Sequence, residues 1–554
     1  MDVMHDFASS DSGLTIKRST FSGQPHVRTT FNAGKLVPLG HPFEVLPGDT
    51  IRMDCSALVR MITPYAPVMD DAYLDVYFFW TPLRQLWSHF EEEQGANKST
   101  FWDDPTDWVE PRLDLGSYGT TVATGNPLDY LGVPPGVSGL SISALPLANY
   151  LKIWDEWFRD ENLQAPHPAV SVIYNARNNA DVYPNLGFGA SDPKQLLSVN
   201  KYHDLFTSCL PSPQKGDAVK VPVGGQAPLD VADAINNFSQ SDLGLKFSTV
   251  TPGVSGKSYP LEIGGDTKLV GASGTASSAI AGNFVTGTNL YADLSKATGA
   301  TVNELRLAFQ TQKLLERDAR GGTRYVEMLK SHFGVAPSSE ILNRSELLGS
   351  IHQRLNMTQV NQTSQPSSPS GDNSVGSTGA YSATGLNKSA FVKSFKEFGY
   401  VQALACVRVK HSYGQGLHKV WSRFRRFDRY YPEFANVGEM PIYKREILAK
   451  DAKKDEVFGF NEAFVEYRYF ENQATGLMRP DVSGTVGKTW SYVDDFSSVA
   501  LNSDFITEQP SNIDNTIIYQ SSNGPVQFKA DFMFDIKATR PMPVKSYPGL
   551  IDHN

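Results

Sequence analysis

Residues 421–431 carry the side chains of this sequence that are best suited to binding chemistry, because arginines and aromatic residues alternate there. Guanidinium groups bind phosphates and aromatic rings stack on bases, which is how proteins hold single-stranded nucleic acid without reading its sequence. The same residue types are enriched in the centres of protein–protein interfaces. The segment therefore predicts either a DNA contact or a contact between subunits, carried by Trp421, Arg423, Phe424, Arg425, Arg426, Arg429 and Tyr430.

Other groups with catalytic or metal-binding potential lack the spacing that such chemistry needs. The glycine-rich stretch at 271–275 has no Lys-Ser/Thr after it, so it does not match a phosphate-binding loop. His411 and His418 have no cysteine or third ligand nearby, which favours hydrogen-bonded or exposed histidines over a metal site. The acidic residues at 103–107 lack the pattern of a calcium loop and are expected to be solvated. We therefore expect no catalytic residues, no metal and no cofactor.

The composition limits the partners that the chain can bind. Its 554 residues carry a formal net charge of −9, so contact with nucleic acid requires a local basic region. Residues 401–450 supply one, with 10 basic and 4 acidic side chains. Three widely separated cysteines favour free thiols in a reducing compartment. We expect no secretory signal at residues 1–6 and no membrane insertion.

Alternation of apolar and polar residues predicts the strands that must position these side chains. The clearest run is 51–61, and further strands are expected at 73–80, 405–410, 464–470 and 528–538. Helical spacing of apolar residues predicts helices at 150–158, 301–321 and 323–333, of which the last two end at glycines. Together with 45 glycines and 34 prolines, this pattern predicts a mostly β fold with few helices.

Two stretches depart from this pattern. Residues 222–300 contain 12 glycines and only ten charged residues, and we interpret them as an insertion. Residues 361–387 are rich in Ser, Gly, Thr, Gln and Pro, which predicts a flexible loop. The expected organisation is a core formed by residues 1–221 and 301–554, interrupted by the insertion at 222–300.

Several strings along the chain resemble the major capsid protein of gokushovirus-type microviruses, which are small tailless bacteriophages with circular single-stranded DNA. These strings occur in the family's order and span nearly the whole chain, with only the two loop stretches outside them. They lie at 29–34, 46–50, 77–82, 153–164, 203–208, 213–216, 316–325, 331–335, 455–460, 466–469, 540–543 and 548–553.

The resemblance implies an eight-stranded antiparallel jelly roll with long insertions between strands, whose copies assemble into a T=1 icosahedral shell. It places the insertion at 222–300 outward, near the threefold axes. The string at 316–325 suggests intersubunit or structural roles for Arg317, Arg320, Arg324 and Tyr325. Because the insertion lacks the strand pattern of a core, we expect it to contact the host, and its candidate residues are Gly253, Gly256, Gly264, Gly265, Gly271 and Gly274.

The resemblance also implies the chain's partners and location. These partners are further copies of the chain, the single-stranded DNA genome, a small basic DNA-packaging protein, an internal scaffolding protein, a minor DNA pilot protein and a receptor on the bacterial surface. The protein would be made and assembled in the host cytoplasm and reside in the virion. A different hypothesis, prompted by abundant aromatic residues and acidic loops, is a jelly-roll carbohydrate-binding protein or glycoside hydrolase.

Overall fold

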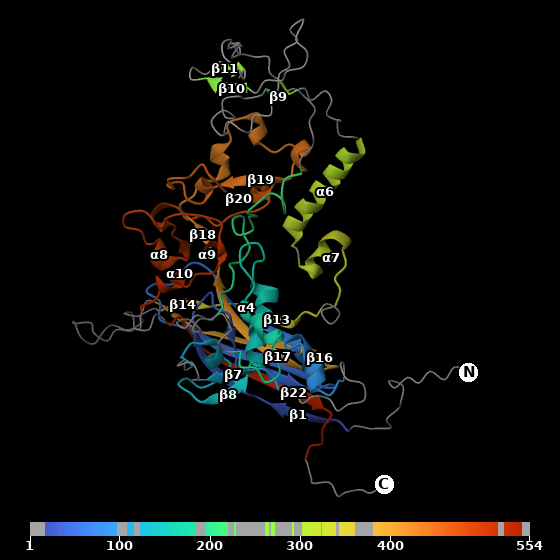
Figure 1. The fold of residues 1–554 in the computed structure, drawn as a ribbon. Helices are drawn as coiled ribbons and strands as arrows, with labels where there is room; N and C mark the ends of the chain where they lie inside the picture. The colour runs from blue at the N-terminus through green and yellow to red at the C-terminus, as the bar shows by residue number, and fades with distance from the viewer. Residues whose placement is uncertain are drawn as a thin grey trace, which may run out of the picture. The chain divides into compact units, whose positions relative to one another are not determined.

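The computed structural model describes residues 17–96, 108–115, 122–182, 196–219, 227–228, 261–264, 268–271, 291–292, 302–322, 324–338, 343–360, 380–518 and 526–545. The chain divides into two compact units, one of residues 1–215 and 316–554 and the other of residues 216–315 (Figure 1). Most of the expected insertion and residues 361–379 of the expected loop lie outside the described residues.

The first sheet of the larger unit has the strand order β1, β22, β5, β16, and β2 also pairs with β22. All of these pairings are antiparallel. The alternation in the sequence places one face of β5 and β22 on the core and leaves the other partly exposed. The strands are β1 (Ser19–Gly23), β2 (His26–Phe31), β5 (Thr50–Met61), β16 (Thr384–Ser394) and β22 (Phe528–Arg540).

The second sheet has the order β13, β6, β17, β3, with β4 also paired to β17, and it too is antiparallel. Its central strands β6 and β17 are buried along most of their length, because both faces of this sheet are covered. The strands are β3 (Val37–Pro38), β4 (Phe43–Val45), β6 (Ala72–Pro82), β13 (Glu346–Arg354) and β17 (Gly399–Val409).

The main hydrophobic core lies between the two sheets. Phe78 of β6 packs against Phe391 of β16 and Phe534 of β22, with ring centroids 6.0 and 6.2 Å apart. Inward residues of β5, β6, β17 and β22 belong to this one cluster. The structure therefore confirms a mostly β chain with antiparallel sheets and few helices.

A second cluster covers the outer face of the second sheet. Phe79, Leu404 and Cys406 of this sheet pack with side chains of short helices and the loops between them, among them Tyr150 of α3 and Trp87 in the loop before α1. The helix expected at 150–158 is formed by the end of α3 and a following π-helix. The covering elements are α1 (Phe90–Glu93), α2 (Pro127–Tyr130), α3 (Leu145–Ile153), η3 (Trp154–Phe158), α4 (Pro168–Tyr174) and the pair β7 (Arg112–Leu115) and β8 (Leu140–Ser143).

A third, smaller cluster is built largely by the last third of the chain around Ile447, Phe458 and Phe505. The strand expected at 464–470 is wrong, because Phe464 adopts a left-handed backbone conformation (φ 54°) and a 3-10 turn follows it. This region contains β18 (Ser412–Tyr413), β19 (Glu439–Tyr443), β20 (Val457–Glu462), β21 (Val493–Asp494), α8 (Gly487–Trp490), α9 (Ser503–Ile506), α10 (Ser511–Asp514) and the 3-10 turns η7 (Lys419–Ser422), η8 (Arg426–Asp428), η9 (Pro432–Phe434) and η11 (Val465–Tyr467).

The loop expected at 361–387 ends earlier than predicted. Residues 380–387 belong to β15 (Ala380–Ser382), which pairs with β14 (Met357–Gln359), and to the start of β16. Hydrogen bonding to neighbouring strands outweighs the low strand propensity of glycine and serine here.

Helices expected near 301–321 and 323–333 are present as α6 (Val302–Gly321) and α7 (Tyr325–Phe333). Gly334 ends α7 in the left-handed conformation (φ 69°), where glycine carries no steric penalty. The described parts of the smaller unit include the antiparallel pairs β9 (Ala227–Pro228) with β12 (Tyr291–Ala292) and β10 (Leu261–Gly264) with β11 (Lys268–Gly271). No helix within the described ranges is long and apolar enough to cross a membrane.

Candidate interaction surface

The segment at 421–431 folds as a series of short 3-10 turns rather than as a strand or long helix. Its shape is held by Asp428, whose Oδ2 accepts hydrogen bonds from the backbone N–H groups of Arg425 (2.7 Å) and Phe424 (2.9 Å). These two hydrogen bonds lower the pKa of Asp428 below its usual value. The carboxylate thus fixes the turn that presents the neighbouring arginine and phenylalanine side chains.

Arg423 differs from the other arginines of this segment because its side chain is only 11% exposed. Its guanidinium lies 2.5 Å from Glu466 and stacks over the ring of Tyr467, 4.4 Å from the centroid. A side chain paired in this way anchors the segment to the 3-10 turn at 465–467. Within one chain, the guanidinium of Arg423 is therefore engaged by Glu466 and Tyr467.

The predicted aromatic residues Trp421 and Phe424, and Phe427 between them and Tyr430, are largely exposed. Trp421 is 71% exposed, Phe424 86% and Phe427 67%. Tyr430 is 46% exposed and packs edge-on against Phe464, with ring centroids 5.5 Å apart. Large exposed aromatic groups gathered in one segment are unusual on a monomer and mark interaction sites.

The remaining arginines of the segment are exposed among these rings. Arg425 and Arg429 are exposed, and Arg426 lies over the rings of Phe427 and Tyr431, at 5.9 and 5.4 Å from their centroids. We define the aromatic–arginine surface as the exposed side chains of this segment other than Tyr430. Its members are Trp421, Phe424, Arg425, Arg426, Phe427 and Arg429.

The sequence interpretation missed two exposed aromatic residues that follow the turn at 465–467. Tyr469 is 53% exposed and Phe470 is 92% exposed. They were assigned to the strand expected at 464–470, since apolar and polar residues alternate there. An alternation of apolar and polar residues is also compatible with a loop whose aromatic side chains are exposed, as Tyr469 and Phe470 are here.

Two of the residues suggested by the string at 316–325 connect helices to other elements. Arg320 pairs with Glu439 of β19 and donates to Asn461 of β20 at 3.1 Å. Arg324 donates to the backbone carbonyl oxygens of Asp155 (3.0 Å) and Arg159 (2.9 Å). Both therefore act within one chain and fasten α6 and α7.

The other two residues of this string are exposed on their helices. Arg317 faces solvent on α6. Tyr325, at the start of α7, is 62% exposed. These two side chains are accessible to another molecule, whereas Arg320, although partly exposed, and Arg324 are engaged by partners within the chain.

A buried ionic network, which the sequence interpretation also missed, surrounds His411. Its Nδ1 lies 2.9 Å from Asp494 and its Nε2 lies 3.1 Å from Glu508, while Lys201 lies 3.4 Å from Asp494. Burial lowers the pKa of His411, but the charges of Asp494 and Glu508 outweigh it and raise the pKa to about 10. The two flanking carboxylates therefore favour the protonated form of His411. Of the two alternatives expected for His411, hydrogen-bonded or exposed, the structure shows the hydrogen-bonded one.

A second polar network is centred on Asp75 of β6. Its carboxylate accepts hydrogen bonds from Arg408 (2.6 Å) and Tyr202 (2.7 Å) and lies 2.6 Å from Nδ1 of His352. Burial, with the charge of Asp75, raises the pKa of Tyr202 well above its usual value. Like the His411 network, this network connects strands to a loop that is distant in sequence, here the loop of Tyr202, and its role is structural.

The described residues give no indication of a metal centre or a reactive thiol. No group of three or more His, Cys, Asp or Glu within the described ranges is arranged to hold a metal ion. Cys55, Cys209 and Cys406 are free and buried, and burial raises the pKa of the Cys55 and Cys406 thiols to about 12.

Of the glycines proposed for host contact, the structure describes only two. Gly264 ends β10 and Gly271 ends β11, and they pair with Lys268 and Leu261 respectively. The other four candidates, Gly253, Gly256, Gly265 and Gly274, lie outside the described residues.

Comparison with known proteins shows similarity along the full chain. A family model described as capsid protein (F protein) matches residues 9–550. The protein named capsid protein VP1 of Spiroplasma virus 4 is 36% identical over 99% of this chain and 98% of its own length. The corresponding proteins of Bdellovibrio phage phiMH2K and Chlamydia phage 1 are 36% and 32% identical, over 98% and 99% of this chain and 97% and 98% of their own lengths. The resemblance found in the sequence is thereby confirmed.

Proposed function

Because the chain belongs to the capsid protein (F protein) family and has a structural capsid role, we propose that its copies assemble into a T=1 icosahedral shell around circular single-stranded DNA. The single observation that carries this proposal is the similarity to capsid proteins over nearly the whole chain. The antiparallel two-sheet fold supports it further, since jelly rolls of eight strands are built from two such sheets. The role requires contact between subunits and no catalysis.

The aromatic–arginine surface is the part of the described chain best suited to such a contact. Its rings are exposed on the monomer, and covering them with a neighbouring subunit would remove apolar area from water. Its arginines could alternatively hold genome phosphates while the rings stack on bases. Because Arg423 is paired with Glu466, this proposal rests on Arg425, Arg426 and Arg429.

The insertion at 222–300 is proposed to contact the bacterial surface, and the family resemblance supports this assignment. The same resemblance supports a basic DNA-packaging protein, an internal scaffolding protein and a DNA pilot protein as partners. A net charge of −9 is consistent with a need for basic partners beside the genome. Similarity to capsid proteins favours this function over a carbohydrate-binding protein or glycoside hydrolase.

Electron microscopy and sedimentation of the chain co-expressed with its scaffolding partner test the shell directly. We expect closed particles of uniform diameter. If only monomers are found under conditions that keep the chain folded, the assembly proposal is wrong. A chain lacking 222–300 should still form shells but attach less to host cells, whereas loss of assembly would refute a role confined to attachment.

Replacing Arg425, Arg426 and Arg429 together by glutamine separates the two roles of the surface. If the arginines hold DNA, shells should form but release DNA at lower salt, because fewer phosphate contacts remain. If the surface is an intersubunit contact, shells should fail to form or become less stable. Arg177→Gln is the control, because it removes an exposed arginine that belongs to none of the candidate contact residues.

A further inference from the structure

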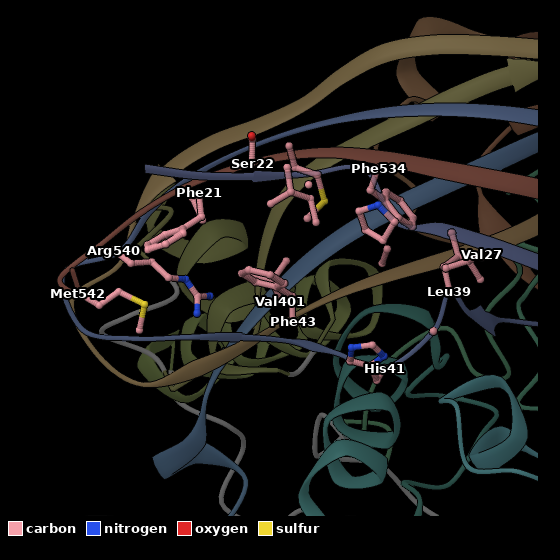
Figure 2. A pocket seen from close by; sticks show the side chains of 17 residues that line it. Phe21, Ser22, Val27, Leu39, His41, Phe43, Val401, Phe534, Arg540 and Met542 are labelled. Carbon is pink, nitrogen blue, oxygen red and sulfur yellow. The ribbon is translucent and has the colours of Figure 1, made fainter. Parts of the chain in front are cut away.

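An apolar cavity of about 470 Å³ lies between the two sheets, near the ends of β1 and β22 (Figure 2). Its walls come from both sheets, with Ile536 and Ala538 on β22 and Val401 and Ala403 on β17. Figure 2 shows Arg540 and Met542 at one end of the lining and Val27 and Leu39 at the other. The cavity is separate from the aromatic–arginine surface and has no part in the proposed function.

The cavity exists because the core is incomplete at this end of the sandwich. Ile536 lies between Phe534 and Ala538 in the inward-facing row of β22, yet it is only partly buried while its neighbours are 5% and 4% exposed. Ala403 of β17 is likewise partly buried between Val401 (3% exposed) and Ala405 (0%).

Small side chains facing each other explain the gap. Ala403 and Ala538 line the cavity from opposite sheets, and neither can fill the space between them. Because Ile536 and Ala403 are partly exposed, the cavity is open to water, and contact between apolar side chains and water is unfavourable. Apolar matter placed in this cavity would therefore complete the core.

One end of the cavity carries a cation. The Nε of Arg540 lies 3.3 Å from Asp49, its Nη2 donates to the carbonyl oxygen of Glu44 at 2.7 Å, and the guanidinium lies over the ring of Phe43. Within the part of the chain that the structure describes, Nη1 makes no hydrogen bond. The guanidinium of Arg540 is thus held in place at one end of the apolar cavity, and its Nη1 can still donate a hydrogen bond to a ligand.

We propose that this cavity binds a single-chain amphiphile of the medium-chain fatty acid class, with the acyl chain between the sheets and the carboxylate at Arg540. The volume lies within the roughly 300–1,000 Å³ range of small-molecule sites, and a mostly apolar lining with one fixed polar group is their usual composition. The acyl chain supplies the missing core volume, and the carboxylate accepts from Nη1.

The test is titration of the purified full-length chain with dodecanoate, followed by calorimetry and thermal unfolding. We expect one dodecanoate per chain and a raised Tm, because a ligand that binds only the folded state stabilises it. Dodecanol, which has the same chain without the charge, should bind about tenfold more weakly, since hydrogen bonds to charged groups are the stronger ones. Arg540→Gln should reduce dodecanoate affinity to that of dodecanol and leave dodecanol binding unchanged.

A larger side chain in the cavity wall gives a second variant, in which loss of binding can be distinguished from loss of folding. Ala538→Leu should abolish dodecanoate binding while keeping or raising the Tm of the free protein, because the new side chain occupies the void. Lys537→Leu is the matched control, since it adds a leucine to the exposed face of the same strand and should leave binding unchanged.

Four results would overturn the proposal. These are no binding by the intact chain, unchanged binding by Ala538→Leu, binding only after residues 1–16 are deleted, and binding by free chains but not by assembled shells. The third result would assign the cavity to the chain's own N-terminal segment. The fourth would assign it to a neighbouring copy.

Discussion

Two regions only ten residues apart along the chain have opposite surroundings. His411 lies in a network of charged groups, and its side chain is 2% exposed. Trp421, Phe424 and Phe427 are each more than 60% exposed. The usual preference of charged groups for the surface and aromatic groups for the interior is thus reversed in both places.

The difference shows what each region is built to do. The charges around His411 have partners within the chain, so they connect the end of β17 to α9 and β21 without needing another molecule. The side chains of the aromatic–arginine surface are exposed, while Arg423, Asp428 and Tyr430 of the same segment make the contacts that hold it in place. The first region is therefore complete within one chain, whereas we propose that the second is completed by another molecule.

Replacing His411 by glutamine should have the largest effect on stability. It would leave Asp494 and Glu508 buried with Lys201 as the nearest cation, and breaking a buried pair costs about 3 kcal/mol or more. Urea denaturation of the purified chain measures this change. His203→Gln is the control, because His203 is exposed, and it should change the free energy of unfolding by no more than about 0.5 kcal/mol. If His411→Gln lowered the free energy of unfolding no more than His203→Gln does, the network would contribute nothing to stability.

Arg423→Gln should have the next largest effect. It would leave the carboxylate of Glu466, which is 4% exposed, without its cation and would cost about 2 kcal/mol. Arg425→Gln, two residues away on the exposed surface, should cost about 0.5 kcal/mol or less. The same denaturation experiment compares the two variants. If Arg425 proved the more costly, the division between anchoring and exposed arginines would be incorrect.

The His411 network should also make stability depend on pH. Its pKa is raised from 6.5 to about 10 in the folded chain, so the folded state binds an extra proton between these values. The stabilisation is complete below about pH 6.5 and is lost as the pH rises toward 10, with a slope of up to about 1.4 kcal/mol per pH unit. Denaturation between pH 7 and 9 measures the slope. His411→Gln should flatten it, and an unchanged slope would assign it to other groups.

The sequence predicted correctly those strands in which apolar and polar residues alternate along the whole strand. The alternation at 51–61 and 528–538 correctly predicted β5 and β22, because a half-buried strand needs that pattern. It failed at 464–470, where the left-handed Phe464 ends any extended structure. The His411 network was beyond prediction, since Lys201 and Asp494 are far apart in sequence and meet only through the fold. Recognition of the family supplied the function that spacing alone left open.

Replacing Phe424 and Phe427 by serine should change stability least and assembly most. Both rings are mostly exposed, so the isolated chain should lose no more than about 0.5 kcal/mol per substitution. Phe464→Ser, which truncates a neighbouring ring that is 6% exposed, should instead cost about 3 kcal/mol. Denaturation of the free chain and particle counts by electron microscopy are compared for all three variants.

The double variant should unfold like the parent chain but form fewer shells or shells that retain less DNA, because it lacks the two rings that a partner is proposed to cover. Normal shells with normal DNA content would mean that the exposed rings meet no partner. In that case the proposal that another molecule covers the aromatic–arginine surface would be wrong. Tyr469 and Phe470, which are also exposed, would be the next aromatic residues to replace.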